Sequence, residues 1–246
     1  MSMWRLELLR LVRTQRWLIL FAVFGSVGVM GPATARFLPD LMESLGEEAV
    51  ASIPPMTAAD GISQFLGNAL QFGILAVAFV GAAALAFDSK AEIAVFFRTR
   101  AAVTDIFIPR FVISATASVL AFGFGMTIAY VGTGILLEWL DVGAVIIGAI
   151  LFMLYLVFAI AVIGVIASFL RSVPGVALFS VGILIALGLL SIIRVLAPWL
   201  PGALVGATDS LIRGGEFDYG RSIIVTVVLI GAMVKFAIMR LETREV

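Results

Sequence analysis

The sequence contains no histidine and no cysteine, so several kinds of chemistry lack the residues they depend on. Histidine is the usual general base near neutral pH, and cysteine supplies thiolate nucleophiles, disulfides and most structural zinc ligands. The two lysines, Lys90 and Lys235, stand outside the Gly-Lys-Ser/Thr context in which a P-loop holds nucleotide phosphates. We therefore expect neither an enzyme nor a bound metal or cofactor, and the sequence does not indicate any catalytic residue.

The chain also lacks an excess of charge of either sign. Sixteen lysines and arginines balance sixteen acidic residues, so the basic surface typical of nucleic-acid-binding proteins is not expected and nucleic acid is not an expected partner. What the chain has in abundance is apolar surface. Hydrophobic residues make up 62% and charged residues 13% of it, and the mean hydropathy is +1.18. A soluble domain is about half apolar and about a quarter charged, so the composition predicts a membrane protein.

Long stretches between the charged residues predict the spans, because a helix needs about 20 mostly apolar residues to cross a bilayer. The last stretch contains Lys235 near its end, where a long side chain can reach the headgroups. We do not expect a cleavable signal peptide, since the first stretch lacks a short apolar core followed by a small-residue cleavage site. The prediction is an all-α polytopic membrane protein, with residues 1–246 as a single transmembrane domain. The six predicted transmembrane helices are 17–35, 62–87, 111–137, 143–170, 173–194 and 222–239.

The distribution of basic residues predicts the orientation, because short cytoplasmic loops are rich in lysine and arginine. With both termini in the cytoplasm, four of the sixteen basic residues fall outside, namely Arg36, Arg194, Arg213 and Arg221. This arrangement fits an even number of spans. We expect a multi-pass protein of the cell membrane, a bacterial inner or plasma membrane.

Two predicted cytoplasmic segments combine apolar and basic residues. Residues 1–16 place Trp4, Leu8 and Leu11 on one side of a helix with arginines around the other, which favours a helix lying in the membrane interface. Such a helix is either a charged anchor or an elbow that docks a partner. Residues 88–110 carry adjacent Phe96 and Phe97 among charges, which is typical of a docking helix or of a solvated loop with stop-transfer charges.

A polar stripe runs along the second predicted span. Gln64, Asn68 and Gln71 follow one another at helical spacing in an otherwise apolar segment. Polar groups in lipid need partners, so the stripe indicates hydrogen bonds between helices or, alternatively, a substrate path.

The order of these features resembles the type-2 ABC transporter permease family. The shared features are an interfacial N-terminal helix, six spans, a substantial cytoplasmic loop after the second span and an apolar segment before the last one. The loop from Asp88 through Phe96-Phe97-Arg98-Thr99-Arg100 to Pro109-Arg110 resembles the family's coupling loop. Ile166–Ser172 and Leu196–Pro201 also look like the family's sequences.

The resemblance implies a permease subunit that forms a translocation pathway with a second copy or a related permease. Separate ATPase subunits would bind ATP and magnesium and drive export of a lipid, drug, peptide or other hydrophobic compound. Gln64, Asn68 and Gln71 become candidates for the pathway or the dimer interface. The residues implied to dock the ATPase are Arg10, Arg13, Glu92, Phe96, Phe97, Arg98, Arg100, Asp105 and Arg110.

Two other classes of function remain open at this stage. A membrane assembly or immunity-type protein would act through helix contacts alone. A facilitator or secondary transporter would move its substrate without any ATPase. An ATPase partner whose turnover responds to this protein separates the three classes.

Overall fold

The computed structural model describes residues 2–43, 56–86, 102–191, 193 and 195–244. These residues form helices, turns and short connections, and none of them forms a strand. Six helical segments are long and apolar enough to cross a membrane, which confirms the predicted all-α fold with six spans. The spans are Arg16–Asp40, Ala58–Leu85, Val103–Leu136, Val142–Phe169, Val173–Leu190 and Gly220–Glu242.

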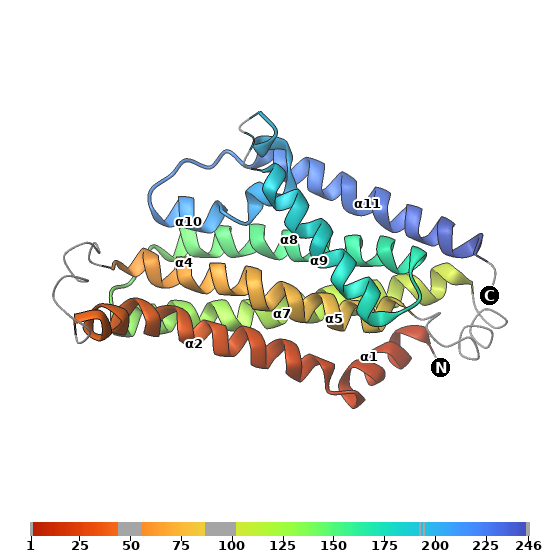
Figure 1. Ribbon diagram of the computed structural model, residues 1–246, viewed down its shortest axis with the longest axis horizontal. Coiled ribbons are helices and arrows are strands. Elements are labelled where there is room, and N and C mark those ends of the chain that lie inside the picture. The colour runs from red at the N-terminus through yellow and green to blue at the C-terminus, as the bar shows by residue number, and fades with distance from the viewer. Residues whose placement is uncertain (1, 44–55, 87–101, 192, 194, 245–246) are drawn as a thin grey trace.

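The long helices lie side by side in an elongated bundle (Figure 1). The N-terminus and the C-terminus lie at the same end of this bundle, as an even number of spans requires. Between α9 and α11 the chain forms three short helices, and the last of them, α10, lies along the first part of α8 (Figure 1). The helices are α1 (Met3–Arg13), α2 (Arg16–Glu43), α4 (Ala58–Asn68), η1 (Ala69–Gly73), α5 (Ile74–Leu85), α7 (Val103–Leu136), α8 (Val142–Phe169), α9 (Val173–Leu190), η3 (Ala197–Trp199), η4 (Pro201–Leu204), α10 (Ala207–Ile212) and α11 (Gly220–Glu242).

Two helices extend well beyond the stretches predicted from apolar residues. Helix α2 continues to Glu43 through Pro32 and Pro39, and α7 begins at Val103 rather than at residue 111. Proline is tolerated in transmembrane helices because neighbouring groups satisfy the freed backbone. The early start of α7 places Asp105 and Arg110 on a helix, whereas the sequence predicted both of them in the cytoplasmic loop.

Helices α2 and α7 touch through their backbones. A Cβ atom added at Gly28 would collide with the carbonyl oxygen of Gly125, and one added at Gly125 would collide with the carbonyl oxygen of Phe24. Glycines at such crossings let membrane helices approach closely enough for van der Waals packing. The glycine-rich sequence of these spans therefore serves the contact between α2 and α7.

A cluster of buried aromatic rings joins four of the spans. The ring of Phe122 on α7 stacks on Phe152 of α8, with 4.4 Å between centroids, and contacts Phe24 of α2 edge-on at 5.7 Å. Phe65 of α4 lies 5.6 Å from the same ring. All four rings are buried, so Phe122 is the centre of the packing between α2, α4, α7 and α8.

The last two spans lie at the periphery of the bundle. In the most apolar part of each span, 67% of the residues of α8 are buried, against 22% for α9 and 17% for α11. Helix α8 is therefore the central span, and α9 and α11 present most of their surface to the surroundings.

Candidate functional site

A buried ion pair joins the N-terminal helix to the third span. Nε of Arg110 on α7 donates to Oε1 of Glu7 on α1 at 2.8 Å, and the two side chains are 1% and 4% exposed. Arg10, one turn further along α1, lies 3.5 Å from the other carboxylate oxygen of Glu7. A buried charge is tolerated only when it is paired and hydrogen-bonded, and both members of this pair meet that condition.

Three arginines from three different helices converge on the carboxyl end of α5. Arg10 of α1 and Arg16 of α2 both donate to the carbonyl oxygen of Ala83, at 3.3 and 2.9 Å. Arg110 of α7 donates to the carbonyl oxygen of Ala84 at 3.2 Å. The last carbonyls of a helix lack intrahelical partners and carry partial negative charge, so they attract guanidinium groups. We call Glu7, Arg10, Arg16 and Arg110 the α5-end cluster.

A tight turn sets the direction of α1 relative to α2. Gln15 adopts a left-handed backbone conformation with φ of 55°, and the N–H of Thr14 closes α1 by donating to the carbonyl of Arg10. Helix α1 lies at an angle to α2, as Figure 1 shows, and its buried residue Glu7 contacts α7. Arg13 is exposed at the end of α1.

The structure divides the residues implied to dock an ATPase into three groups. Asp105 and Arg13 are exposed, and Arg10 is one-third exposed. Arg110 is buried, and its guanidinium donates to Glu7 and to the carbonyl end of α5; its docking role stays a prediction. The remaining members lie outside the described residues, and their docking role stays a prediction; they are Glu92, Phe96, Phe97, Arg98 and Arg100.

A second polar network lies at the opposite end of the α4–α5 span. Thr57 and Asp60 form a capping box, in which the backbone N–H and the hydroxyl of Thr57 donate to Asp60 at 2.7 and 2.8 Å. Such a box satisfies backbone donors that the first turn of a helix leaves unpaired. The other carboxylate oxygen of Asp60 accepts a hydrogen bond from Nη2 of Arg213 at 2.7 Å.

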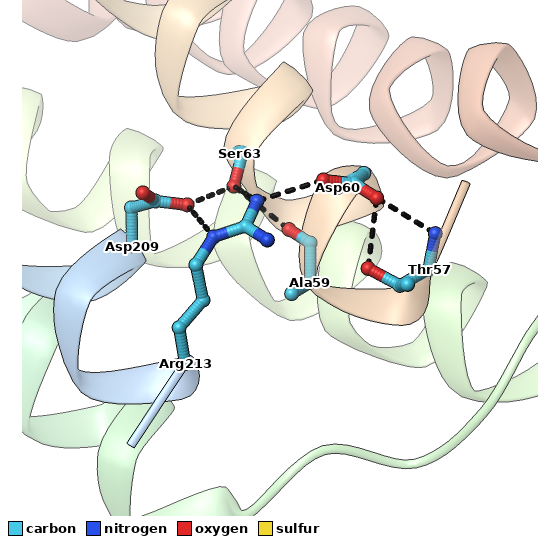
Figure 2. A network of polar contacts seen from close by, with 6 residues as sticks. All are labelled: Thr57, Ala59, Asp60, Ser63, Asp209 and Arg213. Carbon is cyan, nitrogen blue, oxygen red and sulfur yellow. Dashed lines mark hydrogen bonds and ion pairs between the residues drawn. The ribbon is translucent and has the colours of Figure 1, made fainter. Parts of the chain in front are cut away.

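Arg213 connects this cap to α10. Its Nε donates to Asp209 at 3.0 Å, and its Nη2 also lies 3.3 Å from the hydroxyl of Ser63 (Figure 2). The Ser63 hydroxyl in turn lies within hydrogen-bonding distance of Asp209 and donates to the carbonyl of Ala59 at 2.8 Å. We call Thr57, Asp60, Ser63, Asp209 and Arg213 the α4–α10 network. Hydrogen bonds to Asp60 and Asp209 raise the pKa of Arg213 above its ordinary value.

The predicted polar stripe is interrupted by a change of helix type. The five residues Ala69–Gly73 form a π turn, whose hydrogen bonds close over one more residue than those of an α-helix. The side chains that follow it are therefore displaced from the α-helical spacing on which the prediction rested. Gln64 and Asn68 are half-buried on α4, whereas Gln71 is exposed and lines a cavity between α5 and α9. Of the three, only Gln71 lines that cavity.

Sequence reasoning missed most of the residues that form these polar sites. Glu7 is too far along the chain from Arg110, and Arg16 from Ala83, for any spacing rule to connect them. The α4–α10 network had one local signal in the sequence, because Asp209 and Arg213 are four residues apart and oppositely charged residues at this spacing interact on a helix. Among the described residues there is no group of three His, Cys, Asp or Glu side chains that could hold a metal ion.

The comparisons with known proteins did not identify a family. No protein-family model matches the chain, and no curated protein matches it at a significant level.

Proposed function

We propose that this protein is the membrane subunit of an ABC transporter of the type-2 class, in which separate ATPase subunits supply the energy. The support comes from the six spans, the placement of the termini at one end of the bundle and the contacts made by α1. The transported compound would be hydrophobic, and export is the direction that the resemblance implies.

The observation that carries the proposal is the α5-end cluster. Arginines of α1, α2 and α7 all bond the carbonyl end of α5, and α5 is the last described element before residues 87–101. A displacement of residues 87–101 by a docked ATPase would therefore act on α5 and, through Ala83 and Ala84, on three other helices. An N-terminal helix that served only as a charged anchor in the interface would not need a buried carboxylate pairing with the third span.

The same cluster supports a mechanism for coupling. ATP binding and hydrolysis would bring the two ATPase subunits together and apart, and their surfaces would displace residues 87–101 and the exposed face of α1 together. Because Glu7 and Arg110 are buried between α1 and α7, these helices would tilt as one unit. The span Ala58–Leu85 would then tilt about its far end, which the α4–α10 network holds in place through Asp60.

The test first asks whether a P-loop ATPase co-purifies with this protein or is encoded beside it, and then measures ATP hydrolysis by that ATPase in phospholipid vesicles with and without the full chain. We expect the chain to change the hydrolysis rate and Arg13→Glu to reduce this effect, because Arg13 is exposed on α1. Arg221→Glu is the matched control, since Arg221 is an exposed arginine near the start of α11. Both variants reverse one charge outside the α5-end cluster.

The other classes of function give different results in the same vesicles. A rate of hydrolysis that does not respond to the chain contradicts the proposal. If the vesicles nevertheless take up an apolar tracer without ATPase, the protein is a facilitator or secondary transporter. If hydrolysis does not respond to the chain and the vesicles take up no tracer, the remaining class is an assembly or immunity role through helix contacts.

A further inference from the structure

A cavity of about 450 Å³ lies between the second, fourth and fifth spans and η4. Small-molecule sites typically have volumes of about 300–1,000 Å³, so the cavity has the size of a ligand site. Its walls are mainly leucine, isoleucine and valine side chains, most of them on α9, and none of the described residues that line it is charged. Gln71 of η1 and Tyr155 of α8 are its polar side chains.

Tyr155 is a buried residue at the wall of this cavity. The residue is 5% exposed, and its hydroxyl makes no hydrogen bond to the described part of the chain. Tyrosine hydroxyls usually find a hydrogen-bond partner when the residue is buried, so an occupant of the cavity that bonds this hydroxyl would be favoured. The carboxamide of Gln71 likewise makes no side-chain hydrogen bond to described residues. The cavity therefore offers two hydrogen-bonding groups to an occupant.

The opening of the cavity lies on the side of the bundle. Ile185 and Leu189 of α9, at its edge, are 59% and 60% exposed, and Leu70 on the opposite edge is 39% exposed. All three residues belong to helices that are long and apolar enough to cross a membrane, so the opening would face the hydrocarbon of a bilayer. An occupant would then enter from the membrane rather than from water.

The size of the cavity and its lack of charge restrict the occupant. A helix of a second copy is 10–12 Å wide with a pitch of 5.4 Å, so about one turn of it would fill the whole volume. A phosphate headgroup would have no basic residue to pair with among the described residues of the lining, and burying an unpaired charge is strongly unfavourable. The site fits a slender apolar molecule with one uncharged oxygen that can bond Tyr155 and Gln71.

We propose that this cavity binds a long-chain, uncharged compound from the bilayer through a single hydroxyl or carbonyl group, as a long-chain alcohol has. Gly188, Gly202 and Gly206 leave room for the chain, and a Cβ added at Gly188 or Gly206 would meet no atom within 4 Å. This inference does not rest on the proposed function, because it requires no ATPase.

The probe is a long-chain alcohol with a diazirine beside its hydroxyl, mixed into phosphatidylcholine vesicles that contain the purified full chain. After illumination, mass spectrometry of peptides maps the labelled residues. We expect labels around Tyr155 and on α9. Tyr155→Phe should lower the labelling about two- to tenfold, which corresponds to the loss of one hydrogen bond. Tyr130→Phe is its control, since the Tyr130 hydroxyl donates to the carbonyl of Leu140 outside the cavity.

A matched pair of glycine variants tests the cavity by filling it. Gly188→Leu should abolish the labelling because the leucine side chain occupies the cavity. Gly182→Leu should leave it unchanged, since Gly182 also lies on α9 with no atom within 4 Å of its added Cβ but does not line this cavity.

Three results would overturn the proposal. One is equal labelling of the two glycine variants. Another is labelling of the cavity by a short-chain, water-soluble alcohol probe but not by the long-chain probe, which would exclude the membrane as the source. The third is a Gly188→Cys variant that forms disulfide-linked dimers in vesicles, because a second copy would then cover the opening.

Discussion

Arg110 and Glu7 are separated by 103 positions along the chain, yet Nε of the arginine lies 2.8 Å from a carboxylate oxygen of the glutamate. Both residues are buried. The pair places α1 against α7 and brings Arg10 and Arg110 together at the carbonyl end of α5. The N-terminal helix is therefore part of the packed bundle rather than a separate appendage.

Replacement of Arg110 should destabilise the protein strongly. Arg110→Met leaves the Glu7 carboxylate buried with the longer, 3.5 Å contact to Arg10 as its remaining ion pair among the described residues, and breaking a buried pair in this way costs about 3–5 kcal/mol. Arg13→Met is the control, since an exposed arginine contributes little to stability. The measurement is the free energy of unfolding in mixed detergent micelles. A loss of similar size in the two variants would contradict the structural role of Arg110.

The contact between α2 and α7 should not tolerate a side chain at Gly125. Gly125→Val directs its Cβ into the carbonyl of Phe24, and forced overpacking of this kind typically costs about 1–3 kcal/mol. Gly231→Val on α11 makes the same chemical change where no atom lies within 4 Å of the added Cβ. We expect a lower unfolding temperature for the first variant alone. Equal temperatures would show that the two backbones are further apart than described.

The α4–α10 network should hold α10 against the bundle. Thr208 on α10 is fully buried, so Thr208→Cys gives the only thiol in a chain without cysteine. Adding Arg213→Ala should increase its rate of labelling by a maleimide up to about fivefold, because a partly exposed ion pair is worth up to about 1 kcal/mol. Arg221→Ala, which removes an arginine stacked on Trp199, is the comparison. Unchanged labelling in the Arg213 variant would mean that packing alone holds α10.

The predicted orientation can be tested with single cysteines at the two ends of the bundle. Ser2→Cys and Thr243→Cys, near the termini, should react with an impermeant maleimide only after the cells are permeabilised. Phe217→Cys, an exposed position before α11, should react with intact cells. Both expectations follow from the basic residues on the predicted cytoplasmic side. The reverse pattern would invert the topology.

The apolar stretches of the sequence were sufficient to predict six spans because the bilayer imposes a length and a composition on each. The ends of the spans were harder to predict. Asp105 and Arg110 were read as the end of a loop, yet a helix can contain a charged residue when a distant partner neutralises it, as Glu7 does for Arg110. The periodicity of the sequence contains no information about that partner.

The same limit applies to the polar residues of the candidate site. The stripe of Gln64, Asn68 and Gln71 assumed a uniform α-helix, and the π turn at Ala69–Gly73 depends on packing rather than on a recognisable sequence signal. Asp60 precedes the predicted span 62–87, yet with Thr57 it caps α4 and binds Arg213, which is 153 positions away. Contacts across such separations follow from the fold and could not be derived from residue spacing.

The uneven burial of the spans determines how the chain would yield to a pulling force. Within a bilayer the hydrophobic effect does not hold helices together, so each helix resists extraction from the bundle mainly through its packing contacts. Helix α11 has the smallest buried share, 17%, and the central α8 has the largest, 67%. Pulled from its C-terminus, the chain would release α11 at a lower force than α8, and the force would rise as the extraction reached the centre of the bundle.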